Sequence, residues 1–230
     1  MQVTRGRFKI LLAAACLAIF GAVAYSVISY DVFVIDTVIR EEIYALRTES
    51  LTRVLTVITY TANWQFISVM CMVLLVIPKT CRPFGMPLSI TAIMASGSNT
   101  LAKHLFQRIR PDIALHLIEQ GGYSFPSGHS TTGMLFYGMM IFLLRRQLLP
   151  DMSDAVISPN KNRTAVNLLT VLLSFWIIII GFSRIYLGVH YPTDVIAGWS
   201  FGLFLFTLLS TVFSSRGIGK NILTGREEKP

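Results

Sequence analysis

The residues most suited to chemistry lie in one short stretch, Ser124-Phe125-Pro126-Ser127-Gly128-His129-Ser130. Proline followed by serine and glycine is typical of a helix start, because proline has no N–H to lose and a serine hydroxyl can cap the free N–H groups. Those first-turn N–H groups have no partner within the helix, and the helix dipole adds positive charge there. The motif therefore predicts an anion site with a hydroxyl at Ser127, close backbone approach at Gly128 and a titratable His129. The alternative is a plain helix cap followed by an isolated histidine.

Three cations stand elsewhere in the chain at spacings that suit the same anion. Lys103 is followed after six residues by Arg110-Pro111, and Arg184 follows a serine near the end of a long apolar run. Arginine presents a planar fork of N–H donors that matches the oxygens of a phosphate group. Singly, such cations are also explained by snorkelling from helix ends or by contact with lipid headgroups. Their shared position at one membrane level favours function, because charge at that depth is costly.

Two histidines and a carboxylate complete the set. His129 belongs to the helix start, and His190 precedes Asp194 by four residues. Together they can supply a nucleophile or base, an acid and a group that orients the nucleophile. Arg108 is interpreted as a loop or headgroup contact, and we assign no catalytic role to His104 or His116.

Composition indicates an integral membrane protein. Of 230 residues, 53% are hydrophobic and 14% are charged, whereas a soluble domain is about a quarter charged. The net charge of +8 does not indicate nucleic-acid binding, since the basic residues flank apolar runs as membrane topology requires. The three cysteines suggest neither a disulfide framework nor a zinc site.

The apolar runs predict an all-α fold, a bundle of six transmembrane helices forming a single domain over residues 1–230. A short amphipathic segment over 31–53 is expected on the membrane surface between the first two spans. The first run also has the features of a secretory signal peptide, although its length favours a retained helix. The third span is rich in small polar residues and should be central. The predicted spans are 10–29, 54–77, 86–106, 127–144, 165–186 and 192–213.

Orientation follows from the distribution of Lys and Arg. With the N-terminus inside, the inner segments hold 13 of the 20 basic residues and the outer segments hold 7. Because cytoplasmic segments carry the excess of positive charge, both termini should be cytoplasmic and the candidate site extracytoplasmic.

These three sets of residues resemble the three-part signature of the type 2 phosphatidic acid phosphatase superfamily. The match holds in residue type, spacing and order, and the six-span layout extends the resemblance over nearly the whole chain. The run Gly188-Val189-His190-Tyr191-Pro192-Thr193-Asp194 looks most like bacterial plasma-membrane lipid phosphatases of the phosphatidylglycerophosphatase B and undecaprenyl-diphosphatase type.

The resemblance implies a role for each residue. His190 attacks phosphorus and forms a phosphohistidine, Asp194 orients His190, and His129 protonates the leaving oxygen and then helps to activate water. No metal and no cofactor is implied, because fixed cations can stabilise phosphoryl transfer. The groups expected to hold the phosphoryl oxygens are Lys103, Arg110, Ser127, the Gly128 N–H and Arg184.

The expected partners are the bilayer and a lipid phosphate, such as phosphatidylglycerol phosphate, phosphatidic acid or undecaprenyl diphosphate. One alternative is a lipid-to-lipid phosphotransferase that uses the same site. Vanadium haloperoxidases belong to the same resemblance group but are soluble, and a transporter would not need the nucleophile, acid and orienter together. The sequence makes no prediction of oligomeric state.

Overall fold

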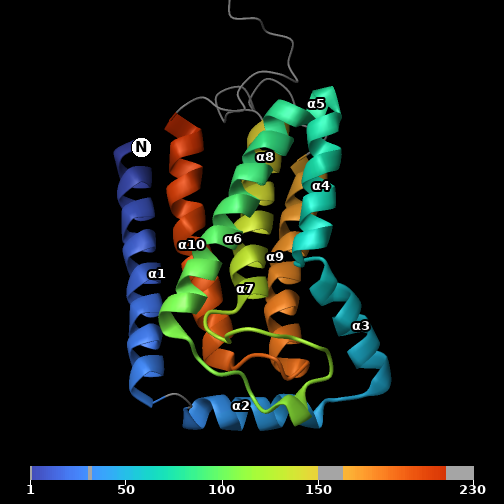
Figure 1. Cartoon of the computed structure of the whole chain (residues 1–230). Coiled ribbons are helices and arrows are strands. Elements are labelled where there is room, and N and C mark those ends of the chain that lie inside the picture. The colour runs from blue at the N-terminus through green and yellow to red at the C-terminus, as the bar shows by residue number, and fades with distance from the viewer. Residues whose placement is uncertain (1, 31–32, 150–162, 216–230) are drawn as a thin grey trace, which may run out of the picture.

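Figure 1 shows the computed structural model, in which long helices lie side by side and α2 crosses one end of the bundle. The structure describes residues 2–30, 33–149 and 163–215, and within these ranges it contains helices and no strand. The prediction of an all-α fold is confirmed. The elements are α1 (Gln2–Tyr30), α2 (Val34–Ala45), α3 (Glu49–Tyr60), α4 (Trp64–Val76), α5 (Pro78–Thr80), η1 (Cys81–Gly85), α6 (Met86–Phe106), η2 (Ile113–Leu115), α7 (Gly128–Thr132), η3 (Gly133–Tyr137), α8 (Gly138–Leu148), α9 (Arg163–Tyr186) and α10 (Pro192–Ser215).

The predicted count of six spans is not confirmed. Three described helices are long and apolar enough to cross a membrane, namely Gly6–Tyr30, Arg163–Tyr186 and Pro192–Ser214. The pair α3 and α4 would supply a fourth span if it crosses as one unit, bent by 47°. The expected spans 86–106 and 127–144 are not among these helices. In the first, α6 carries several Ser, Thr and Asn residues, and in the second the π-helical turn η3 divides the segment from α7 to α8.

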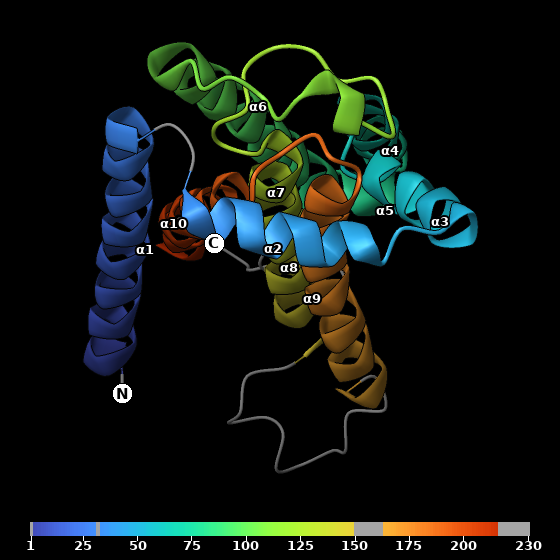
Figure 2. The same cartoon turned by 90° about the horizontal axis from the view of Figure 1, so that it is seen from below.

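The expected surface segment over 31–53 is divided between two helices. Its first part forms α2, which lies across the ends of α9 and α10 when the bundle is viewed from below (Figure 2). Its last residues begin α3, and the expected span 54–77 is broken at Thr61–Asn63 before α4 starts. Ala62 and Asn63 at this break line a cavity within the bundle.

Two glycines bring α10 unusually close to α7. A Cβ at Gly198 would lie 2.8 Å from the Ser127 oxygen, and one at Gly202 would lie 2.7 Å from the Thr131 oxygen. Small residues four apart allow such backbone contact between membrane helices. The contact fixes the start of α7 against the start of α10, where the Ser127 N–H donates to the Asp194 carbonyl at 3.0 Å.

The main core fills the space between α4, α6, η3, α8, α9 and α10. Its fully buried members include Leu88, Leu135, Phe136, Met139 and Ile180. A second cluster lies over the site end of the bundle, where Leu55 of α3 packs with residues of the α9–α10 loop. This packing holds the functional loops on a rigid frame. Asp31, the loop residues 150–162 and the tail 216–230, which entered the sequence predictions, lie outside the described residues.

Candidate active site

The helix start predicted at the central motif is present. Ser127 is the N-cap of α7, and its buried hydroxyl oxygen accepts hydrogen bonds from the Ser130 N–H at 3.4 Å and the Ser130 hydroxyl at 2.9 Å. Gly128 follows at the cavity wall, where an added Cβ would lie 2.9 Å from Nδ2 of Asn99. Gly128 therefore brings the backbone of the α7 start to the cavity without a side chain of its own, and the first turn of a helix is suited to an anion.

Lys103 and Arg110 converge on the loop that precedes α7. The Lys103 ammonium donates to the Tyr123 carbonyl, and at 3.4 Å to the Ser124 carbonyl. Arg110 donates to the carbonyls of Gly122 at 2.8 Å, Tyr123 at 3.1 Å and Val189 at 2.6 Å. All these acceptors are neutral, and among the described residues neither cation forms an ion pair with a carboxylate.

Arg184 is the third predicted cation and is 1% exposed. Its Nη1 donates to the Thr59 hydroxyl at 2.9 Å and its Nη2 donates to Oε1 of Gln120 at 2.6 Å, while its Nε has no hydrogen-bond partner among the described residues. A buried guanidinium with an unused donor is costly unless another acceptor serves it. An anion bound beside Arg184 would meet that need.

His190 and Asp194 form the predicted pair at the start of α10. The His190 Nδ1–H donates to Oδ2 of Asp194 at 3.3 Å, which leaves Nε2 with its lone pair. That lone pair faces Nη1 of Arg110 at 3.2 Å. Burial, with the charges of Arg110, Lys103 and Arg184, lowers the pKa of His190 well below its usual value. His190 is therefore neutral at pH 7, the state in which an imidazole acts as a nucleophile.

The Asp194 carboxylate is fully buried and has several donors. Its Oδ2 accepts from the Ser124 hydroxyl and, at 2.9 Å, from the Tyr191 N–H. Its Oδ1 accepts from Nη1 of Arg108 at 2.6 Å. These bonds hold the carboxylate in one orientation, as required of a group that aligns a histidine.

The interpretation of Arg108 as a loop or headgroup contact is wrong. Its side chain is fully buried and forms ion pairs with Asp194 and, at 2.8 Å, with Asp36 of α2. It also donates to the Thr193 hydroxyl at 2.8 Å. Burial lowers the pKa of Arg108, but the two carboxylates outweigh that effect and the net shift is upward.

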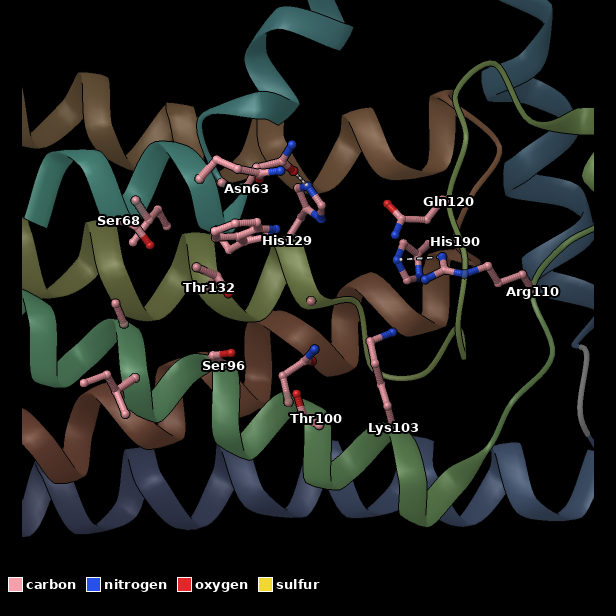
Figure 3. Close-up of a pocket in the computed structure, with 18 residues that line it drawn as sticks. Asn63, Ser68, Ser96, Thr100, Lys103, Arg110, Gln120, His129, Thr132 and His190 are labelled. Atoms are coloured by element: carbon pink, nitrogen blue, oxygen red, sulfur yellow. Dashed lines mark hydrogen bonds between the residues drawn. The ribbon is translucent and has the colours of Figure 1, made fainter.

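A cavity of about 690 Å³ joins these groups, and Figure 3 shows its lining. His129 projects into it and pairs through Nε2 with Oδ1 of Asn63, at the break between α3 and α4. Five of the predicted residues line the cavity: Lys103, Arg110, Gly128, His129 and His190. Ser127, Arg184 and Asp194 are buried behind it.

Away from the cations the cavity runs between α4 and α6. Its walls there mix neutral polar side chains with apolar ones, and Trp64 and Ile93 are each 73% exposed. The cavity thus extends from a charged end to the apolar surface of the bundle.

Sequence reasoning missed several residues around the predicted set. Asn63 and Gln120 bind His129 and Arg184, and Ser124 binds Asp194. Ser124 stands within the motif already singled out, but the other residues gave no signal because only the folded bundle brings them near. Within the described ranges, no three His, Cys, Asp or Glu residues cluster as metal ligands would.

Comparison with known proteins shows similarity in sequence and in fold. The profile of the PAP2 superfamily matches residues 84–218. Phosphatidylglycerophosphatase B of Bacillus subtilis (strain 168) is 36% identical over 111 residues, covering 48% of this chain and 49% of that protein. Undecaprenyl-diphosphatase of Sulfolobus acidocaldarius is 29% identical over 154 residues, covering 65% of this chain and 64% of that protein. The alignments therefore span between about half and two thirds of these relatives.

A solved structure extends the similarity to most of the fold. The crystal structure of a transmembrane PAP2 type phosphatidylglycerolphosphate phosphatase from Bacillus subtilis matches with a TM-score of 0.72 and 25% sequence identity. The match covers 88% of this chain and 96% of that one.

Proposed function

Because the chain belongs to the PAP2 superfamily, we propose that it is a membrane lipid phosphatase that hydrolyses lipid phosphate monoesters or diphosphates without a metal. The observation that carries the proposal is the cavity end itself. A neutral histidine aligned by a buried carboxylate faces a space bordered by Lys103, Arg110 and the start of α7, with Arg184 buried behind it. Phosphoryl transfer needs such positioning and charge stabilisation.

In the proposed first step, a phosphoryl group enters the charged end of the cavity. Lys103 and Arg110 release the backbone carbonyls that they now bind and donate to phosphate oxygens instead. Arg184, the Ser127 hydroxyl and the Gly128 N–H donate to the same phosphate group. Charged donors bind ionised oxygens more strongly than neutral carbonyls. Withdrawal of Arg110 from Nε2 of His190 then frees the nucleophile only when substrate is bound.

The covalent step forms a bond between Nε2 of His190 and phosphorus, and breaks the bond between phosphorus and the leaving oxygen. His129 donates a proton to that oxygen, so a monoester releases its alcohol and a diphosphate releases its lipid phosphate in the protonated form. Water then attacks the phosphohistidine with His129 accepting its proton, which releases inorganic phosphate and restores His190. Asp194 stabilises the positive charge that His190 acquires in each half-reaction.

The shape of the cavity supports a lipid substrate. Its charged end lies at the ends of the bundle helices, and its other end reaches the apolar surface between α4 and α6. A lipid can place its phosphate at the cations while its chains stay in hydrocarbon. The names of the relatives favour phosphatidylglycerol phosphate and undecaprenyl diphosphate, and phosphatidic acid carries the same monoester.

The site is proposed to face away from the cytoplasm of a bacterial plasma membrane. The N-terminal end of α1 and the basic segment around α5 lie at the end of the bundle opposite α2 (Figure 1). Cytoplasmic ends carry the positive charge, which puts the α2 end outside. Cysteines introduced between Asp112 and Tyr123 should react with an impermeant thiol reagent in intact cells, and protection of all of them would reverse this orientation.

The test measures inorganic phosphate released by the detergent-purified chain from lipid phosphates and from glycerol phosphate, in matched micelles. Higher kcat/KM for the lipids supports the proposal, and equal or better turnover of glycerol phosphate defeats the lipid assignment. Loss of the lipid monoester without phosphate release, with a newly phosphorylated lipid acceptor, would identify the phosphotransferase alternative. His190→Ala is the control for background hydrolysis.

A further inference from the structure

Helix α2 reaches the site through one buried carboxylate. Asp36 lies in the first turn of α2, is 0% exposed, and is 158 positions before Asp194 in the chain. Its Oδ2 accepts from Nη2 of Arg108 at 2.8 Å and from the Thr193 hydroxyl at 2.8 Å, and its Oδ1 accepts from the Thr193 N–H at 2.9 Å. A buried carboxylate needs close and well-placed partners, because these offset the cost of removing its charge from water.

The same arginine carries the contact onward to the catalytic carboxylate. Nη1 of Arg108 donates to Oδ1 of Asp194 at 2.6 Å, while Nη2 is held by Asp36. The two ends of one planar guanidinium are thus fixed by two carboxylates. The Asp194 oxygen that Arg108 binds is Oδ1, which leaves Oδ2 to His190 and its other donors.

The second carboxylate also changes the charge of the group. An Arg108–Asp194 pair alone carries no net charge, and it would stabilise the positive charge developing on His190 only weakly. Asp36, Arg108 and Asp194 together carry a net charge of −1. Because electrostatic interactions are strong in a buried site, that extra charge favours the attacking histidine.

A second contact fixes the other end of the loop that carries His190. Arg47, just after α2, donates from Nε and Nη2 to the Tyr186 carbonyl at 3.0 and 2.8 Å, at the last residue of α9. Asp36 accordingly holds the start of α10 and Arg47 holds the end of α9, and the loop between them contains His190. Figure 2 shows α2 spanning the ends of both helices.

From this geometry we propose that Asp36 is a positioning residue, which acts through Arg108 on Asp194 and so sets the rate of the phosphoryl-transfer step without contributing to phosphate binding. The inference rests on the proposed phosphatase function and deepens it. It predicts that loss of the Asp36 charge lowers kcat and leaves the affinity of the phosphate site unchanged, because none of the phosphate-binding groups contacts Asp36.

The experiment compares Asp36→Asn with Glu41→Gln, which removes an exposed carboxylate from the same helix. Phosphate release from a lipid monoester gives kcat, and inhibition by vanadate reports the phosphate site. Asp36→Asn should lower kcat roughly tenfold to a hundredfold, the value of a charge-assisted hydrogen bond, with the vanadate inhibition constant unchanged. Glu41→Gln should match the unmodified chain in both measurements.

A double-mutant cycle then separates positioning from general destabilisation. If Asp36 acts through Asp194, adding Asp36→Asn to Asp194→Asn should cause little further loss of kcat. Equal losses in both backgrounds, or a parallel loss of vanadate affinity, would overturn the proposal.

Thr193→Val supplies a milder change if Asp36→Asn does not fold. It keeps the side-chain shape but removes the hydroxyl between Arg108 and Asp36. This variant must likewise lower kcat without altering vanadate inhibition.

Phosphate release by the unmodified chain separates failure of the proposed function from failure of the role of Asp36. If the unmodified chain releases no phosphate from any lipid, the proposed function fails and the role of Asp36 fails with it. If the unmodified chain turns over and Asp36→Asn equals it, only the role of Asp36 is wrong.

Discussion

Arg108 and Arg110 are two residues apart in one loop, yet they have opposite surroundings. Arg110 borders the cavity and donates to neutral backbone carbonyls, and burial lowers its pKa to about 10 despite the nearby Asp194. Arg108 is enclosed with two carboxylates that raise its pKa overall. A cation that must bind a substrate anion needs partners it can release, whereas a cation that positions another residue needs partners it keeps. The contacts of the two arginines divide the site into an open, anion-binding half and a closed, orienting half.

The largest effect is expected from the carboxylate at the centre of the closed half. Asp194→Asn should lower kcat by roughly two orders of magnitude or more, as for groups that act as a unit with the nucleophile. Asp112→Asn, the same change at an exposed position of the neighbouring loop, should leave kcat unchanged. A loss of less than about threefold in Asp194→Asn would remove the orienting half from the mechanism.

A smaller and more diagnostic effect is expected from matched changes of the two arginines. Lysine keeps the charge but loses the planar fork. Arg110→Lys should weaken vanadate inhibition roughly tenfold, because one charge-assisted hydrogen bond to the anion is lost. Arg108→Lys should instead lower kcat by a similar factor while vanadate inhibition stays the same. Identical kinetic signatures for the two variants would mean that the site has no such division.

The smallest effect is expected from chelation. Activity in EDTA should equal activity in added magnesium, since the open half supplies cations where a metal-dependent site would supply carboxylates. Loss of phosphate release in EDTA, restored by magnesium, would show that the cations do not suffice.

Much of the open half could be predicted from sequence, because its residues are carried by short motifs at helix ends. Ser127 as a helix cap and the cations of the neighbouring motifs follow from local rules. The spacing of His190 to Asp194 likewise indicated one member of the closed half. The sequence also indicated correctly that the chain is helical. The six continuous spans stay a prediction, because three described helices, or four with the bent pair α3 and α4, are long and apolar enough to cross a membrane.

Apart from Asp194, the closed half could not be predicted in the same way. Asp36 lies in a segment whose charge pattern is typical of a membrane-surface helix. Its partner Arg108 lies in a polar loop, where the sequence alone indicates a loop or headgroup contact. Only tertiary contact over more than 70 residues pairs them. Asn63 and Gln120 are similar cases, because a neutral amide gains a role in the site only from its neighbour.

The most direct test of the account asks whether a phosphoryl group becomes bonded to His190. The purified chain is mixed with lipid carrying a labelled phosphate, quenched within a turnover and mapped by peptide. We expect label on His190 in the unmodified chain, lost in acid and stable in alkali, and no label at that position in His190→Ala. Full turnover by His190→Ala, or label at another residue, would contradict it.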